Sequence, residues 1–565
     1  MTKKINQKLI IFLGFLLLSF FLRFWTLFVS VLDKDESIYI LGADSLLNGN
    51  LPYIEIWDNK PPGIFILFSL AMLIFGKSIL SIRILSIIAT TFTSYFLSRI
   101  GVAIDVKQGE KIGLLAGSLY AIFSLHNDGA AANAEILFAP LVTGAFLWLF
   151  QERKLSNIQV FLIGLILGMG MQIKYLVIMD VFGLVLLGSL SGKAEGKFIN
   201  NFPRLTQKDV LSRTAGICNN FSLFKFYVIL GAGVILPAVV IAVIYKFSGY
   251  FDEYIYATLT ANSKYVAMQN FSWSDLLSRL RKQVLGNILL WLCLFWSPIY
   301  LFVFARDRFK QERNFIYLFL WFSCAFLAVL LSKRFYNHYF LQLLPPLCLI
   351  SAYVMIKSVY FQAVVNVTEK NLPDEHSHEK VSKPTKISSK TKQTILSNSP
   401  KFYVAFPSAF PQIILFLILI YSFAQAGYNK LSKNWEFIYY RYIQRIDTWD
   451  DREALIAKYL RQRIQSTDYI YVVNYEPIIY YLVPTKIPTK YAFPSHLTAM
   501  SQILPINPLP ELNRIMAKNP SYILLAEKDN ISPKYRNALN QYLEQYYVLE
   551  TTIKNVRLYR RYVNN

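Results

Sequence analysis

The sequence predicts a polytopic α-helical membrane protein with a small soluble α/β domain at its C-terminal end. Two observations come from composition: 54% of the 565 residues are hydrophobic and 16% are aromatic, and the mean hydropathy is +0.36. Such values are too apolar for a soluble chain of this length. The third observation is the pattern, because apolar runs near the roughly 20 residues that cross a bilayer recur through most of the chain and soluble patterning then follows.

The apolar runs predict about eleven transmembrane helices and one interfacial or re-entrant segment. The first run, Leu9–Val29, lacks a small-residue cleavage site, so we interpret it as a retained span and not a signal peptide. Gly63–Phe75 is too short to cross comfortably and is expected at the interface. Val160–Leu190 is long enough for two spans, with a break near Lys174. The other expected spans lie near Ile79–Ile100, Ile112–Leu125, Ala134–Phe150, Phe226–Tyr245, Val284–Phe304, Phe315–Leu331, Tyr339–Ile356 and Ile413–Ala426.

Topology explains the net charge of +23 better than a nucleic-acid partner does. Lys and Arg gather in loops between apolar runs, where they face the cytoplasm and contact anionic lipid headgroups. The basic clusters before residue 9 and within 193–213, 306–313 and 380–392 all fall on that side when the spans alternate. The loop after the first span and everything after the last span therefore fall on the extracytoplasmic side of an inner (cell) membrane.

We expect a membrane domain, residues 1–426, and a soluble extracytoplasmic domain, residues 427–565. The membrane domain includes an extracytoplasmic loop with interfacial helices at 33–78 and a polar cytoplasmic loop at 362–408, which is rich in Lys and Ser and expected to be disordered. In the soluble domain we expect strands and helices, namely strands Tyr469–Val473, Tyr522–Ala526 and Val556–Tyr562 and helices Asp451–Ile464 and Pro533–Tyr547.

Neither the cysteines nor the histidines form a convincing metal-ligand pattern. Cys218, Cys293, Cys324 and Cys348 have no ligand spacing, and three of them lie inside apolar runs, so we interpret them as small core residues. His376 and His378 form an H-x-H pair in the polar loop, but no further ligand lies nearby in the sequence.

The stretch Asp33–Phe68 carries the strongest functional signal. Asp33, Asp35, Glu36 and Asp58 follow directly on the first span, where carboxylates are costly unless they face water, a cavity or a partner. A solvated loop at a topology boundary is the alternative explanation. Tyr39 lies one helical turn beyond the Asp35–Glu36 pair. A carboxylate held there is suited to act as general base toward a hydroxyl group.

Basic residues from distant parts of the sequence are expected near these acids. Lys60 precedes the Pro61–Pro62 break, and an ammonium at that level suits a lipid phosphate. Other candidates from the same side of the membrane are Arg83, Lys174, Arg334, His338 and Tyr339. Each basic residue alone can be a snorkelling headgroup contact. Several that converge on one face together with acids favour a binding site.

Three further features have structural explanations. Glu135 is a carboxylate at the membrane edge, although it can equally be a solvated helix start that Asn133 caps. Asp180 lies deep in an apolar run, where pairing with Lys174 is plausible. The GxxxG pair of Gly164 and Gly168 is expected to allow close helix packing.

Four segments resemble the family 39 glycosyltransferases of the GT-C membrane fold, which include protein O-mannosyltransferases and the bacterial lipid A aminoarabinose transferase. The first and most specific is the DES-I-Y pattern at residues 35–39 with PYIEIWDNKPPG at 52–63. GLILGMGMQIKY at 164–175 is similar to the family's glycine-rich helix that ends in Lys. KRFYNHYFLQLLPP at 333–346 is similar to a late Arg/Tyr/Pro-Pro segment. YVVNYEPIIYYLVPTKIPTKYAFP at 471–494 is similar to the C-terminal domain of bacterial members.

The resemblance implies an enzyme that takes a sugar from a polyprenyl-phosphate carrier and hands it to an extracytoplasmic lipid, glycan or protein, with inversion. It implies that Asp35 is the catalytic aspartate with Glu36 beside it, that Lys60 contacts the carrier phosphate, and that Glu135 is the second loop acid. In the aminoarabinose transferase an acid that precedes the lysine helps to hold a metal. Asn59 occupies that place here, with Asp58 one residue earlier, so no metal and no other cofactor is predicted.

Two rival classes remain. One is a lipid or solute transporter, which the clustering of acids at one face and the absence of an apparent inverted repeat disfavour. The other is a glycan ligase or polymerase that shares the lipid-linked substrate. A lipid-borne donor also explains why no nucleotide-binding motif is visible. The sequence does not specify the sugar or the acceptor.

Overall fold

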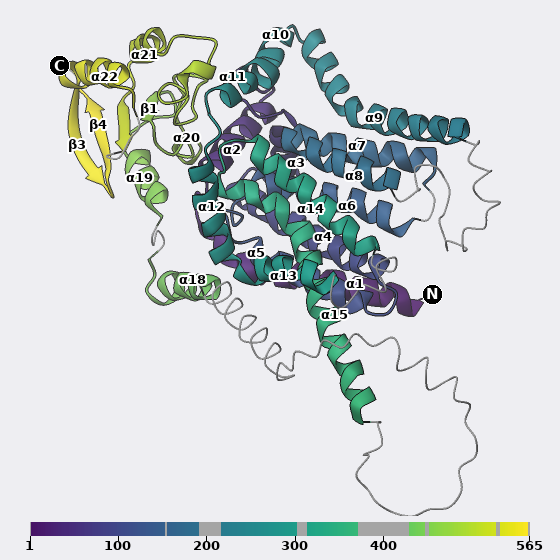
Figure 1. Ribbon diagram of the computed structural model, residues 1–565. Coiled ribbons are helices and arrows are strands. Elements are labelled where there is room, and N and C mark those ends of the chain that lie inside the picture. Colours follow the sequence, from purple (N-terminus) through teal and green to yellow (C-terminus); the bar gives the residue numbers. More distant parts are fainter. Residues whose placement is uncertain are drawn as a thin grey trace, which may run out of the picture.

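The computed structural model describes residues 2–152, 155–190, 216–301, 313–370, 429–446, 451–526 and 531–562. It consists of a helical bundle with a four-stranded sheet domain at one end, and the N-terminus lies at the other end (Figure 1). The polytopic helical class and the C-terminal α/β domain are therefore confirmed. Most of the polar loop expected at 362–408 and the expected span Ile413–Ala426 lie outside the described residues.

The membrane part is built from helices that follow the predicted apolar runs. Their bounds are α1 (Thr2–Arg23), α2 (Lys34–Leu47), α3 (Gly63–Phe75), α4 (Ile79–Ile104), α5 (Gly109–Phe123), α6 (Ala134–Gln151), α7 (Asn157–Ile173), α8 (Ile178–Leu190), α9 (Gly216–Phe247), α10 (Phe251–Ile255), α11 (Ala261–Ala267), α12 (Trp273–Gly286), α13 (Ile288–Ile299), α14 (Arg313–Leu331) and α15 (Leu344–Lys370). A 3₁₀ segment, Asn337–Leu343, precedes α15.

Fewer helices than expected meet the length of a full span. In the described ranges, six helices are long and apolar enough to cross a membrane, or seven if the α12–α13 pair, bent by 101°, counts as one. The shorter apolar helices are Gly63–Phe75, Asn157–Ile173 and Tyr175–Leu190. The expected number of about eleven spans therefore stays a prediction. The chain is a multi-pass membrane protein.

The break expected at Lys174 is confirmed. α7 ends at Ile173, and Lys174 has an extended backbone with φ −156° and ψ 130° before the chain turns into α8. Along α7, Gly164 and Gly168 lie against the backbone of α9, where an added Cβ would collide with the carbonyl oxygens of Leu230 and Val234. The GxxxG pair therefore permits close helix packing, as predicted.

The loop at 33–62 is anchored at both of its ends. Asp33 caps α2 through a 2.9 Å hydrogen bond from the backbone N–H of Asp35, and carboxylates in the first turn are favourable at a helix N-terminus. α3 starts at Gly63 directly after the two prolines, and a side chain at Gly63 would collide with the backbone of Gln172. The expected short helix Gly63–Phe75 is thus confirmed, and its first residue packs closely against the end of α7.

One boundary differs from the prediction. α15 continues to Lys370, so the first residues of the loop expected at 362–408 are helical. No Gly or Pro occurs between Ser358 and Lys370 to end the helix. Cys293, Cys324 and Cys348 are buried free thiols, consistent with their predicted role as core residues.

The C-terminal domain joins a parallel strand pair to an antiparallel hairpin. Its strands are β1 (Ile470–Val473), β2 (Tyr522–Ala526), β3 (Tyr547–Ile553) and β4 (Val556–Arg561), in the order β1-β2-β4-β3. β1 and β2 are parallel, and the other two pairs are antiparallel. The helices are α18 (Asn429–Ile438), α19 (Arg452–Arg461), α20 (Ile479–Leu482), α21 (Pro508–Ala517) and α22 (Pro533–Tyr546). The sequence missed β3, because a helical pattern runs into it without a breaker.

The C-terminal domain is tied to the membrane part by specific hydrogen bonds. The backbone N–H of Trp57 donates to the carbonyl of Lys490 at 2.8 Å. Asn434 on α18 accepts from the backbone N–H of Trp25 and donates to the carbonyl of Phe21, both at 2.7 Å. The Trp57–Lys490 bond holds the sheet domain over the loop that carries the predicted acids, and the Asn434 bonds attach α18 to the end of α1.

Candidate functional site

A cavity of about 1240 Å³ lies between the membrane part and the C-terminal domain. Its membrane wall carries half of the acids and bases predicted from the sequence, namely Asp33, Asp35, Asp58, Lys60 and His338. The residues of this wall include Asp33, Lys34, Asp35, Asp58, Asn59, Lys60, Asp128, Tyr265, Tyr336, His338 and Tyr339. The cavity is large enough for a sugar together with a phosphate group, since ligand pockets commonly have volumes of about 300–1,000 Å³.

Asp35 and Lys60 form the centre of the membrane wall. Lys60 Nζ lies 3.6 Å from Asp35 Oδ2, and both side chains keep partial exposure, 21% and 16%. The Tyr39 hydroxyl donates to the same carboxylate oxygen at 3.4 Å. Burial alone would raise the pKa of Asp35, but the charges of Lys60 and its cationic neighbours outweigh burial and hold that pKa below its usual value. The pair is therefore ionised at neutral pH.

Glu36 and Arg83 do not reach the cavity. Arg83 has no exposed surface, Glu36 is 1% exposed, and the two side chains pair with each other. Arg83 also donates to the carbonyl of Val29 at 3.3 Å. The expectation that Glu36 shares catalysis and that Arg83 binds a phosphate does not fit this placement. We interpret the pair as a structural link between α2 and α4, because breaking a buried pair leaves an uncompensated charge.

Glu135 and Lys174 form a second ion pair just behind the cavity. The Lys174 ammonium also lies 3.8 Å from the centre of the Tyr339 ring, and Tyr339 lines the cavity. The pairing of Lys174 with Asp180 that the sequence suggested is wrong. Asp180 accepts instead from Trp321 Nε1 at 3.0 Å and from Gln342 Nε2 at 2.6 Å.

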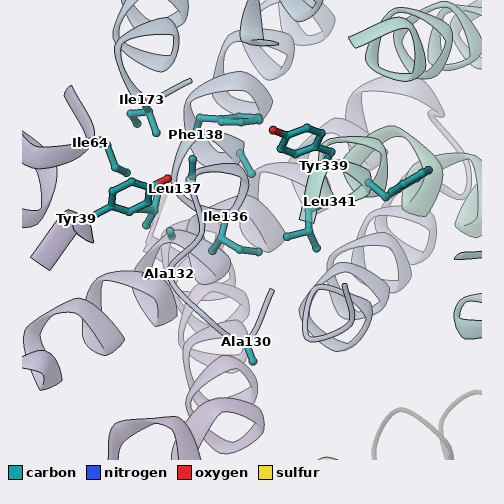
Figure 2. Close-up of a cluster of buried hydrophobic side chains, with 14 of the residues drawn as sticks. Tyr39, Ile64, Ala130, Ala132, Ile136, Leu137, Phe138, Ile173, Tyr339 and Leu341 are labelled. Carbon is teal, nitrogen blue, oxygen red and sulfur yellow. The ribbon is translucent and has the colours of Figure 1, made fainter. Parts of the chain in front are cut away.

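Apolar side chains at the start of α6 pack between the tyrosines that contact the two ion pairs. Figure 2 shows the first turn of α6, with Ile136, Leu137 and Phe138, between Tyr39 and Tyr339. In that view the two tyrosine hydroxyl oxygens are directed toward one another. Both rings are buried. This packing fixes the two phenols that contact Asp35 and Lys174.

Arg334 approaches the cavity indirectly. Its guanidinium lies 3.8 Å from the centre of the Tyr265 ring and donates to the Tyr265 carbonyl at 3.1 Å. Tyr265, Tyr336, His338 and Tyr339 line the cavity, whereas Arg334 stands behind Tyr265. The late segment at 333–339 therefore reaches the site mainly through its aromatic residues and His338.

Asp128 is a site residue that the sequence analysis missed. One ligand atom from each of Asp33, Asp128 and His338 lies within 4.8 Å of the others, an arrangement that can hold a metal ion. Burial and the neighbouring Asp35 raise the pKa of Asp33 to about 8, so negative charge is crowded here. Asn127 and Asp128 both adopt positive φ, which the turn-like HNDG sequence could have signalled.

The residues near Lys60 offer fewer metal ligands. Asn59 is engaged with Asn262, whose amide donates to the Asn59 carbonyl at 2.7 Å. Asp58 lies 3.8 Å from His496 Nε2 across the domain boundary. Burial lowers the pKa of His496 to about 3, so the imidazole is neutral. Among the described residues, the three-ligand set at Asp33 is thus the better candidate for a cation.

Together these features define a membrane protein with a charged, partly enclosed cavity at the junction of a helical bundle and an α/β domain. The comparisons place this architecture in the GT-C fold. The structure of ArnT from Cupriavidus metallidurans bound to undecaprenyl phosphate matches with a TM-score of 0.56 at 12% identity, over 100% of this chain and 99% of that chain. The apo structure of the same ArnT matches with a TM-score of 0.53 at 13% identity, over 98% of both chains.

Over residues 59–206 the sequence matches the family model described as dolichyl-phosphate-mannose-protein mannosyltransferase. This match includes Lys60, Glu135 and Lys174, and it confirms the resemblance inferred from the motifs. No curated protein sequence matches the chain. At the low identities found, the structural likeness establishes the fold alone.

Proposed function

We propose that the protein is a membrane glycosyltransferase that transfers a sugar from a polyprenyl-phosphate carrier to an extracytoplasmic acceptor, with inversion. The observation that carries the proposal is the Asp35–Lys60 pair, exposed to a cavity of about 1240 Å³. A lipid phosphate is already a leaving group. Transfer therefore needs a base for the acceptor hydroxyl and a cation for the departing phosphate, and this pair supplies both.

In the proposed reaction the acceptor oxygen attacks the anomeric carbon while its proton passes to Asp35. The bond between that carbon and the phosphate oxygen breaks, and the polyprenyl phosphate leaves as an anion. Lys60 stabilises the phosphate charge, and His338 and Tyr339 line the same wall. Lys174 and Arg334 act from behind Tyr339 and Tyr265. The undecaprenyl phosphate bound in the similar ArnT structure supports this class of carrier.

We also propose that transfer needs no metal, because Lys60 already provides positive charge at the phosphate. A divalent cation, if present, would be held by Asp33, Asp128 and His338 and would supply additional positive charge next to Asp35. Chelation with EDTA tests this part of the proposal. Transfer that survives chelation supports it, and transfer that is lost and then restored by added divalent cation contradicts it.

Mass spectrometry of cells with and without the protein tests the function. We expect cells that lack it to accumulate a polyprenyl-phosphate sugar and to lose one sugar from a surface glycan, lipid or protein. Asp35→Asn should reproduce that loss. Asp44→Asn, on the same helix but paired with Lys77 outside the cavity, should behave like the natural chain. Unchanged lipid-linked sugars and unchanged surface sugars would rule out the proposal.

A further inference from the structure

The second wall of the cavity comes from the C-terminal domain and is strongly polar. Its residues are Arg452, Glu453, Asn474, Glu476, Phe493, Pro494, Ser495, His496, Ala499, Met500 and Arg536. Guanidinium, carboxylate, amide, hydroxyl and imidazole groups lie on this wall together with the Phe493 ring and the apolar side chains of Pro494, Ala499 and Met500. The wall faces Asp35 and Lys60 across the cavity, so whatever it binds is presented to the proposed base.

The position of this wall in the domain is one where α/β proteins bind ligands. β1 is fully buried and pairs in parallel with β2, and Asn474 and Glu476 follow directly at its carboxyl end. Ligands of open parallel sheets bind outside the carboxyl ends of the strands. Asn474 also has a left-handed backbone with φ 47°. Such conformations persist where the surrounding structure enforces them, and they cluster at ligand sites.

Neighbouring groups hold the wall in place. Arg452 Nη2 donates to Glu453 Oε1 at 2.8 Å, and the Tyr475 hydroxyl donates to the same oxygen at 2.6 Å. The Arg452 guanidinium lies 4.9 Å from the centre of the Tyr475 ring. The segment between Asn474 and Glu476 is therefore anchored through Tyr475 to the start of α19. A binding surface that is fixed beforehand loses less entropy when a ligand arrives.

Glu476, like the His496 imidazole on the same wall, has a buried polar atom without a hydrogen-bond partner among the described residues. Its Oε2 atom is buried and accepts no hydrogen bond from any residue that the structure describes. Burial raises the pKa of Glu476 to about 7, with Lys34 opposing and Glu453 adding to the shift. A buried carboxyl oxygen without a donor costs free energy. Because the Glu476 side chain lines the cavity, a rotation that turns this oxygen toward a ligand hydroxyl supplies the missing hydrogen bond.

We propose that Asn474 and Glu476, framed by Arg452 and Arg536, form the acceptor subsite and recognise a polyhydroxylated, sugar-like group. The proposal rests on the proposed function, because it assigns the acceptor to the wall that faces Asp35. Planar acid and amide groups beside an aromatic ring suit the hydroxyls and the apolar face of a sugar. An acyl chain would require a mainly apolar wall, which this side of the cavity does not offer.

Saturation-transfer NMR on the purified full-length protein tests the proposal. The probes are methyl α-D-mannopyranoside, methyl β-D-glucopyranoside and N-acetyl-D-glucosamine, with a Ser/Thr-rich peptide as the competing class. Undecaprenyl phosphate binding is measured separately on the same samples. Glu476→Ala removes both side-chain oxygens that can accept a hydrogen bond, whereas Glu476→Gln keeps one of them. Glu544→Ala is the matched control, because Glu544 is an exposed glutamate of the same domain.

We expect the natural chain to bind at least one glycoside. Glu476→Ala should weaken that binding by about tenfold, the size expected for one lost hydrogen bond. Glu476→Gln should retain most of the binding, Glu544→Ala all of it, and all variants should bind undecaprenyl phosphate normally. Binding of the peptide instead, no glycoside binding, or glycoside binding that ignores Glu476→Ala would overturn the subsite. If the natural chain does not bind undecaprenyl phosphate, that result would count against the proposed function and not against the subsite alone.

Discussion

Lys60 Nζ lies 3.6 Å from Asp35 Oδ2, and the two residues stand near opposite ends of the loop at 33–62. The ammonium stabilises the carboxylate and keeps it ionised. A phosphate that binds Lys60 competes with Asp35 for the same positive charge. The pKa of Asp35 should then rise, which makes the carboxylate a stronger base when the donor is in place. The pair thereby couples donor binding to base strength.

Asp35→Asn should lower the transfer rate by about two to four orders of magnitude, because the amide keeps the size of the side chain but cannot accept the proton. Carrier binding should persist, since Lys60 remains. Single-turnover transfer and undecaprenyl phosphate binding by the purified protein separate the two effects. Transfer at the natural rate would show that the base lies elsewhere, and Glu135 would be tested next.

Lys60→Ala should weaken undecaprenyl phosphate binding by about ten- to hundredfold, the range for a lost hydrogen bond between charged groups. The loss appears in binding as well as in rate, because the ammonium contacts the phosphate before and during reaction. Lys77→Ala is the control, since Lys77 pairs with Asp44 outside the cavity. Equal effects of the two substitutions would contradict a specific phosphate contact at Lys60.

Arg83→Ala should act on stability. It leaves the Glu36 carboxylate buried without its partner, which costs about 3–5 kcal/mol of unfolding free energy. Arg83→Met combined with Glu36→Gln should recover part of that loss. Arg99→Ala, on the same helix α4 but half-buried, should be nearly neutral. Thermal unfolding of the purified variants measures the effect. If the Arg83→Ala protein is stable but binds the carrier poorly, Arg83 contributes to phosphate binding and the structural interpretation is wrong.

His496 should make the protein sensitive to acid. Burial, with Lys60 adding and Asp35 opposing, lowers its pKa from 6.5 to about 3 in the folded chain. The unfolded chain therefore binds more protons between those values, and the free energy of unfolding falls as pH drops through that window. Asp58 is the nearest carboxylate, at 3.8 Å. His496→Phe should flatten the dependence of the melting temperature on pH between about 6 and 4. An unchanged profile would assign the acid sensitivity to other groups.

Cysteine accessibility labelling tests the proposed orientation. Ser466 in the C-terminal domain and Lys107 between α4 and α5 are both exposed. An impermeant thiol reagent applied to spheroplasts should label Ser466→Cys and not Lys107→Cys, and permeabilised cells should show both. The four natural cysteines are replaced first. The reverse pattern would place the cavity on the cytoplasmic side and remove the basis for an extracytoplasmic acceptor.

The sequence by itself determined the fold class, including a small C-terminal α/β domain, and it predicted the Asp35–Lys60 pair at the centre of the candidate site. Apolar runs long enough for a bilayer define the spans, because unsatisfied backbone groups are too costly in lipid. Carboxylates and a lysine at the end of a span define where polar chemistry is possible. These local signals predicted the break at Lys174 and named Asp35 and Lys60, which the structure places together at the cavity, as candidate site residues.

The tertiary structure decided which of the candidate residues face the cavity. Consecutive residues on a helix point about 100° apart, so Asp35 faces the cavity while Glu36 points into the core toward Arg83. No spacing rule reveals which of the two faces the core, because that depends on how α2 packs. Asp128, Asn474 and Glu476 reach the site through folding of distant segments. Asp128 meets Asp33 and His338 through packing of the membrane part, whereas Asn474 and Glu476 face Asp35 because the C-terminal domain docks on the loop at 33–62.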